Sequence, residues 1–319
     1  MNSNTYSLQR KLLTIHSEDR DKVKYPNINE FRIRLPEELN KIHSMRLVEI
    51  SLPKTVLNIS NDYQNTKLYI TDNPGAMSAT QKEITIPNGT YTNTTLASTI
   101  KTKINETATG LSNYDLSYDE LLDKFLFGNT DNSFSLDFNK QSTFTLTNDK
   151  QPTLWTHPTE WGLGAMLGFD KKQYKSAPSS TASTTVSTQT LPSHYLWSPN
   201  TSHLRDNTIY MDVNKFNSYD ELYPFDSTNP NASGKVNSAF AKIPVSSTNN
   251  VSTSNNLLQN LVHFEPPLER LSTLEFRFRY HNGCLVEFTE NIDFTIEVNY
   301  LNKEIPNPYQ IRIPHTYNL

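Results

Sequence analysis

Apolar and polar residues alternate with a period of two through much of this 319-residue chain. Such alternation is typical of β-strands that bury one face and expose the other. The clearest case lies near the C-terminus, with apolar Phe276, Phe278 and Tyr280 and basic Arg277 and Arg279 between them. The pair Asn282-Gly283 follows, and it predicts a hairpin with a two-residue type I′ turn. The pattern therefore predicts antiparallel sheets.

Several other segments have the same character and are bounded by Pro, Gly or Asn. They are residues 31–35, 45–52, 67–71, 82–87, 124–128, 134–138, 144–147, 207–213 and 293–301, after a first strand that ends at 12–15. One helix is predicted, because Leu96, Ile100 and Ile104 are four apart and Thr92 or Asn93 can cap it. A short helical turn is expected around residues 158–166. Many short strands without alternating helices favour an all-β sandwich.

The order of these segments suggests how the chain is divided. We expect residues 1–80 and 206–301 to form two halves of one sandwich. Residues 81–205 are expected to form an inserted strand–helix–strand subdomain with a Ser/Thr-rich loop at 175–193. Residues 302–319 contain three prolines, which disfavour a helix, and Tyr309, Ile311 and Ile313 alternate with polar residues. We predict that this C-terminal arm docks on a partner, either by adding to a neighbour's sheet edge or by lying in its groove. Residues 1–11 are expected to form a second docking arm.

Composition narrows the classes of function. The net charge is −4 and no long basic block occurs, which argues against nucleic-acid binding. Cys284 is the single cysteine, so an intrachain disulfide is excluded and a reducing compartment is expected. No apolar run approaches the roughly 20 residues that span a bilayer, and the N-terminus does not resemble a signal peptide. We therefore expect a soluble intracellular protein.

No segment of the sequence carries a convincing catalytic motif. The string from Gly162 to Gly168, GLGAMLG, departs from a dinucleotide-binding loop because its third glycine is one place late. A tight loop packed under Trp155 and Trp161 is the better interpretation. The histidines lack metal-ligand spacing, and no G-x-S-x-G sequence occurs. We expect no enzyme activity, no metal and no cofactor, with a hydrolase built from distant residues as the weakest alternative.

Two pairs of arginines alternate with apolar residues and predict basic rows on strand faces: Arg32 with Arg34, and Arg277 with Arg279. One interpretation is cross-strand pairing with acids such as Glu275, Glu287 or Glu297, at about 0.2–1 kcal/mol a pair. The other is a face that meets an acidic neighbour. The candidate interface is therefore Arg32, Arg34, Arg277, Arg279, Tyr309, Ile311 and Ile313.

The charged segment HSEDRDKVKYPNINEFRIRLP, residues 16–36, cannot be buried cheaply and predicts a solvated loop that leads into a strand. Its residues also belong to a longer pattern, I-x-S-x-D-R-D, Y-P-N, F-x-I-x-L-P and S-M-R-L-V-E-I-S-L-P, between Ile15 and Pro53. This pattern resembles the N-terminal region of capsid-associated proteins of large nucleocytoplasmic double-stranded DNA viruses. Residues 84–105, 161–169 and 264–301 are similar to that group in the same order.

The resemblance implies a jelly-roll minor capsid or penton protein, located under or between major capsid capsomers in the virion and assembled in the host cytoplasm. Its expected partners are those capsomers and other minor capsid proteins. The resemblance also allows contact with an internal viral membrane and a homo-oligomer, a pentamer if the chain is the penton protein. The alternative function is a glycan-binding module on the virion surface, with Trp155, Trp161, Tyr195 and Trp197 stacking on sugars.

Overall fold

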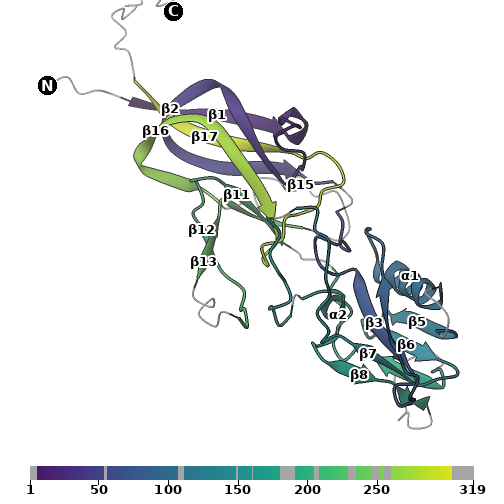
Figure 1. Cartoon of the computed structure of the whole chain (residues 1–319). Helices are drawn as coiled ribbons and strands as arrows, with labels where there is room; N and C mark the ends of the chain where they lie inside the picture. Colours follow the sequence, from purple (N-terminus) through teal and green to yellow (C-terminus); the bar gives the residue numbers. More distant parts are fainter. Residues whose placement is uncertain are drawn as a thin grey trace, which may run out of the picture.

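The computed structural model describes residues 6–53, 56–106, 111–148, 150–159, 161–179, 191–204, 208–228, 235–245, 252–253 and 260–303. Two lobes lie end to end along the long axis of the molecule (Figure 1). The larger lobe is built from the two ends of the chain, and the smaller lobe from the middle. All of the named strand pairs are antiparallel.

One antiparallel sheet forms the larger lobe, with strand order β1-β17-β2-β16-β11-β14 and a short β15 beside β2. Its strands are β1 (Tyr6–His16), β2 (Glu30–Ser51), β11 (Thr208–Val213), β14 (Ala241–Pro244), β15 (Ser252–Thr253), β16 (Val262–Arg279) and β17 (Asp293–Lys303). A two-stranded hairpin of β12 (Tyr219–Leu222) and β13 (Val236–Ala239) projects from it. The first and last strands of the described part of the chain, β1 and β17, are therefore neighbours.

The long strands β2 and β16 bend, so that the sheet folds over on itself (Figure 1). Residues 42–51 of β2 pair with β17, whereas residues 30–34 pair with the C-terminal half of β16. The register of β2 with β16 shifts between Leu271 and Thr273, and such irregularities let strands turn a corner. Phe31 and Phe294 are not paired in register, yet their ring centroids lie 6.4 Å apart, so they meet across the two layers.

A core of aromatic and aliphatic side chains fills the space between the layers. Phe276 lies 5.4 Å from Phe31 and 4.9 Å from Phe294, measured between ring centroids, and all three side chains are buried. Contacts between such rings contribute about 0.5–1.5 kcal/mol beyond the area that they bury. The predicted all-β class is confirmed: an antiparallel, jelly-roll-like sandwich with an inserted smaller α+β lobe.

The predicted hairpin after β16 differs from expectation in its turn. The amide of Gly283 donates to the Tyr280 carbonyl over 3.1 Å, and Tyr280 donates to Cys284 over 2.9 Å. Gly283 alone has a positive φ, 86°, whereas a type I′ turn needs two such residues, so the two-residue prediction was wrong. The loop is one residue longer, and the return arm forms only an isolated bridge between Arg279 and Leu285.

The smaller lobe packs two four-stranded sheets and a helix around a second core. Tyr114 in β5 meets Phe134 in β7 at 5.5 Å between ring centroids, which joins the two sheets. One sheet has the order β5-β6-β10-β9 and the other β4-β3-β7-β8. The elements are β3 (Lys67–Asp72), β4 (Gln81–Thr85), α1 (Asn93–Glu106), β5 (Tyr114–Asp119), β6 (Lys124–Asn129), β7 (Phe134–Asp137), α2 (Leu163–Met166), β8 (Gln173–Lys175), β9 (Ala177–Pro178) and β10 (His194–Trp197).

Both predicted helices are present in this lobe. α1 buries Leu96, Ile100 and Ile104, as their spacing predicted. Thr92 caps it, since its hydroxyl accepts the Thr95 amide over 3.2 Å and the Thr95 hydroxyl accepts the Thr92 amide over 2.8 Å.

The second helix, α2, lies in the glycine-rich string. A Cβ on Gly164 would lie 2.3 Å from Trp161 and 2.6 Å from Phe138. The string is therefore a tightly packed loop under Trp161, as the sequence indicated, in which Gly164 serves packing and Gly162 and Gly168 have positive φ.

Two expectations about this lobe need correction. Strand β3 was assigned to the sandwich, but it pairs with β4 and β7, and Leu68 and Ile70 belong to the second core. The smaller lobe therefore begins before residue 67 rather than at residue 81, and the division of the chain otherwise stays a prediction. Residues 144–147 do not form the predicted strand, because the Thr147 amide donates to the Asp62 carboxylate over 2.6 Å instead of to a sheet.

The two lobes are joined by polar contacts around a small third cluster of Tyr63, Leu154 and Cys284. The Leu285 amide donates to Gln151 over 2.9 Å, and the Glu287 amide donates to the Tyr63 hydroxyl over 2.7 Å. The turn that follows β16 in the sandwich therefore inserts into the smaller lobe.

Candidate interaction surfaces

The charged segment at residues 16–29 is an ordered surface loop, and Arg20 holds its shape. Its guanidinium donates to the carbonyls of Ser17, Tyr25 and Pro26 over 2.8, 2.9 and 2.9 Å. The Asp21 carboxylate accepts the backbone amides of Val23 and Lys24 over 3.1 and 3.2 Å. One planar fork thus fixes three backbone carbonyls, a role suited to arginine. The Asp-Arg-Asp pattern therefore has a structural function, which agrees with the predicted solvated loop.

Arg32, Arg34 and Arg277 differ in how they are paired. Arg32 lies opposite Glu275 in register, and its Nη2 is 3.1 Å from the Glu275 carboxylate. Arg34 is exposed and makes no ion pair with a described residue. Arg277 is half-buried and lies opposite Glu30 on one side and Asp212 on the other. Three acids were suggested as partners of these arginines. Of them, Glu275 alone forms an ion pair with Arg32, Arg34 or Arg277 in the described structure.

The other two acids lie elsewhere. Glu297 is buried and binds Arg46 and Arg10 over 2.9 and 2.8 Å, on the layer that contains β1. Glu287 accepts the Ser60 hydroxyl over 2.8 Å at the junction of the lobes.

Arg279 is enclosed, so it is not available to a neighbouring protein in this structure. Its side chain is 2% exposed, its Nε lies 3.0 Å from Asp212 and its Nη1 lies 2.8 Å from Glu221. The guanidinium also lies over the Tyr210 ring at 5.1 Å. Glu221 comes from β12, so the projecting hairpin covers this end of the basic row. Of the four candidate arginines, Arg32, Arg34 and Arg277 remain accessible. The other candidates, Tyr309, Ile311 and Ile313, lie outside the described residues.

The two carboxyl groups around Arg279 have pKa values that are shifted in opposite directions. Burial raises the pKa of Asp212, against the opposing effect of Arg279. Burial also acts to raise the pKa of Glu221, but hydrogen bonds from His281 and Arg279 outweigh it and lower that pKa. The hairpin is thus attached to the sandwich by a buried charge cluster that the sequence did not reveal, since Asp212, Glu221 and Arg279 are far apart in the chain.

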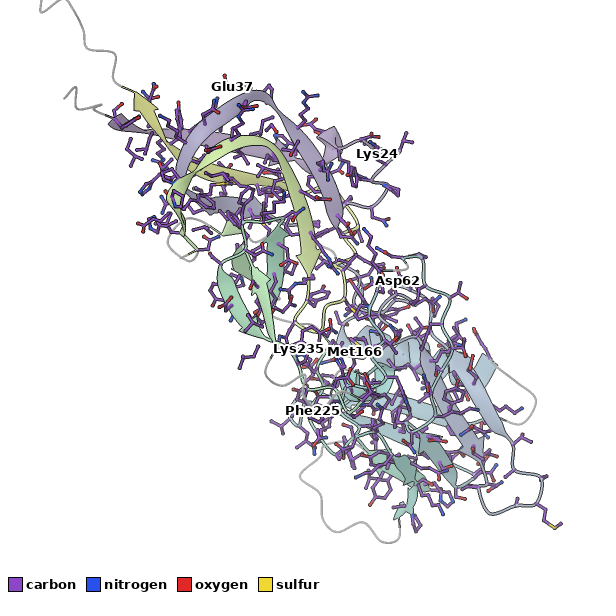
Figure 2. The ribbon with its side chains drawn as sticks, turned by 60° about the vertical axis from the view of Figure 1, so that its left-hand side comes forward. Lys24, Glu37, Asp62, Met166, Phe225 and Lys235 are labelled. Atoms are coloured by element: carbon purple, nitrogen blue, oxygen red, sulfur yellow. The ribbon has the colours of Figure 1, made fainter. Side chains whose placement is uncertain are left out.

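The β12–β13 hairpin also reaches the smaller lobe. The Ser227 amide and hydroxyl donate to the Thr156 carbonyl over 3.1 and 2.8 Å. Figure 2 shows Phe225 and Lys235 at this end of the hairpin, close to the smaller lobe. Leu222 and Val236 face each other across the two strands and are 71% and 53% exposed. The hairpin therefore braces the two lobes and presents apolar side chains to solvent.

Strand β1 forms an open edge of the sandwich. Among the described strands it pairs with β17 alone, along all eleven of its residues. Tyr6, Leu8 and Leu12 are 42%, 59% and 52% exposed along it. Tyr6 lies opposite Lys303 in register, so both ends of the described chain leave the sandwich together, at the end far from the smaller lobe (Figure 1). Residues 6–11, which the sequence predicted as part of a docking arm, are instead part of this strand, and their docking stays a prediction. The open edge itself was not predicted, although Leu8 and Leu12 have the even spacing of one strand face.

The aromatic residues suggested for glycan binding do not form one surface. Trp155 and Trp161 lie edge to face at 5.8 Å and line a pocket of about 450 Å³ in the smaller lobe. Tyr195 and Trp197 are on β10, which belongs to the sheet β5-β6-β10-β9. Neither residue lines that pocket.

Within the described ranges, no group of His, Cys, Asp and Glu side chains could hold a metal ion. No helix in that part of the chain is long and apolar enough to cross a membrane.

Comparisons with known proteins give distant similarities. A family model described as a family of unknown function, DUF5901, matches residues 6–121, which is less than half of the chain. No curated protein sequence matches. Among solved structures, the chain is similar to the mavirus penton protein, with a TM-score of 0.46 and 10% identity over 93% of this chain and 100% of that chain. It is also similar to a chain of the Sputnik virophage structure determined by cryo-EM, with a TM-score of 0.36 and 12% identity over 91% of this chain and 98% of that chain.

Proposed function

We propose that this chain is a structural virion protein, a minor capsid protein that cements or supports major capsid capsomers. A penton protein, which would form a ring of five, is a variant of the same proposal. The proposed partners are the capsomers and other minor capsid proteins, with contact to an internal viral membrane in some positions. The proposed site of assembly is the host cytoplasm.

The main observation that supports this proposal is the open edge of strand β1. A long edge strand with exposed apolar side chains is a liability for a protein that acts alone, because its unpaired amides and carbonyls recruit other strands. The strand contains no proline, and its arginine and its lysine, Arg10 and Lys11, are paired with Glu297 and Glu37 of the same chain. In an assembly the same edge is a docking site, since a neighbour's extended segment adds to it through main-chain hydrogen bonds.

The C-terminal arm is a suitable segment for such an exchange. The described part of the chain ends at Lys303, beside the start of β1. The sequence beyond it includes Tyr309, Ile311 and Ile313, which alternate with polar residues as an added strand requires. We propose that this arm adds to the sheet edge of a neighbouring subunit in the shell. The ordered sequence resemblance between Ile15 and Pro53 supports the same class of protein.

Quantitative mass spectrometry of purified particles tests the proposal. The protein is expected as a stoichiometric component relative to the major capsid protein, and its absence from particles would overturn the structural role. A double substitution, Leu8→Lys with Leu12→Lys, is expected to reduce incorporation, because charge on an edge strand opposes pairing. Val23→Lys is the matched control, since Val23 is 95% exposed in a loop away from the edge.

A further inference from the structure

The pocket of about 450 Å³ in the smaller lobe has the size of a small-molecule site, for which about 300–1,000 Å³ is typical. Three segments enclose it: strand β3 with Gln64, residues 137–146 after β7, and residues 153–163 before α2. It is larger than the cavities of about 100 Å³ at the lobe junction and about 270 Å³ beside Arg277. The capsid role proposed above does not use this pocket.

One wall of the pocket is aromatic. Trp155 and Phe144 are half-buried, and Tyr69 is 5% exposed. Trp161 is fixed between Trp155 and Phe138, with ring centroids at 5.8 and 6.1 Å. The Lys171 ammonium lies 4.1 Å from the centre of the Trp155 ring and so occupies one of its two faces. The other face of that ring is the one on which the C–H face of a pyranose ring can stack.

The charged groups at the pocket are compensated. Lys67 lies 2.7 Å from Glu83, and Lys140 donates to Gln81 over 2.8 Å while its ammonium lies 4.3 Å from the centre of the Tyr69 ring. Asp137 accepts the Gln81 amide over 2.9 Å. Lys171 adds a third ammonium beside the pocket, and it donates to the Trp155 carbonyl. Each of these charged groups already has a partner within the protein, so none is free to bind an anion or a cation.

Free polar groups stand at the rim. Gln141 and Thr143 are exposed, line the pocket and make no side-chain hydrogen bond to another described residue. An amide and a hydroxyl both donate and accept, which matches the hydroxyls of a sugar. From the aromatic wall, the partnered charges and this rim, we propose that the pocket binds a neutral saccharide. Trp155 would be the stacking platform, and Gln141 and Thr143 the groups that hold its hydroxyls.

Glycan-array binding of the full-length protein, with neutral and acidic glycans on one array, tests this site. Neutral glycans are expected to bind, and titration of the best of them should show a loss of roughly tenfold or more in affinity for Trp155→Ala. That substitution also removes packing against Trp161. Thr143→Trp, which fills the pocket from an exposed position, therefore supplies an independent test and is expected to give a similar loss.

Trp197→Phe is the matched control, because Trp197 does not line the pocket, and it should leave binding unchanged. Circular dichroism verifies that each variant is folded. The proposal is overturned if the array shows no neutral glycan bound, if acidic glycans alone are bound, or if folded Thr143→Trp binds as the unmodified protein does.

Discussion

The two lobes differ in how far apart in the sequence their paired strands lie. In the sandwich, β1 pairs with β17 and β2 pairs with β16 and β17, so the first and last parts of the chain must meet before the core exists. In the smaller lobe, β3 pairs with β4 and β5 with β6, a few residues away, and the more distant pairs, β3 with β7 and β6 with β10, still lie between residues 67 and 197. Distant pairing is slow to form because the loop must close first. We therefore infer that the smaller lobe can form early and that the sandwich closes last, leaving β1 at its edge.

The largest expected effect tests whether the two cores unfold separately. Phe127→Ala removes a fully buried ring from the smaller lobe, and Phe294→Ala removes one from the sandwich. Each should lower the free energy of unfolding by about 4 kcal/mol. Native-state hydrogen exchange should place the loss of protection in the mutated lobe. Loss throughout the molecule in both variants would mean that the lobes unfold as a single unit.

The next effect concerns the hairpin that braces the lobes. Arg279→Gln leaves Asp212 and Glu221 without their buried counter-charge, so the free energy of unfolding should fall by about 3 kcal/mol. Arg32→Gln is the control, because its pair with Glu275 is exposed to solvent and its loss should be much smaller. Denaturant titration of both variants measures the difference. Equal small losses would show that the hairpin is not held by the charge cluster.

A smaller effect should appear as a pH dependence at the lobe junction. Burial raises the pKa of Glu287 from its ordinary 4.5 to about 7, with the Asp62 charge adding to the effect. The fold therefore favours the protonated carboxyl. Its contribution to stability is complete below pH 4.5, is lost between pH 4.5 and 7, and is constant above. Figure 2 shows Asp62 where the lobes meet.

Glu287→Gln should remove this dependence, because the amide does not titrate. Thermal unfolding across this range should show the stability of the unmodified protein falling relative to the variant as the pH rises. Glu290→Gln, on the exposed part of the same loop, is the control and should keep the dependence. A parallel pH profile for the unmodified protein and Glu287→Gln would contradict this role.

The sequence predicted local structure better than it predicted surfaces. Period-two alternation and the spacing of Leu96, Ile100 and Ile104 identified strands and a helix, because each depends on neighbours in the chain. The sequence treated Arg277 and Arg279 alike, since they share one strand face. The structure separates them, because Glu221 from a distant hairpin covers Arg279. Such burial depends on tertiary contacts that no local pattern contains.

The same limit applies to the candidate sites. The sequence grouped Trp155 and Trp161 with Tyr195 and Trp197 by proximity in the chain, yet the two pairs belong to different parts of the smaller lobe. The β1 edge was missed for the complementary reason. Whether a strand lies at an edge depends on which strands pair with it, and the partner of β1 is at the other end of the chain.

Hydrogen exchange on the isolated protein and on purified particles tests the central claim, that this sandwich docks its neighbours through the β1 edge and the C-terminal arm. The measurement is read at residues 6–16 and at 309–313. The account predicts that both segments gain protection in the particle. Equal exchange at β1 in the two states, or strong protection from Tyr309 to Ile313 in the isolated monomer, would contradict it.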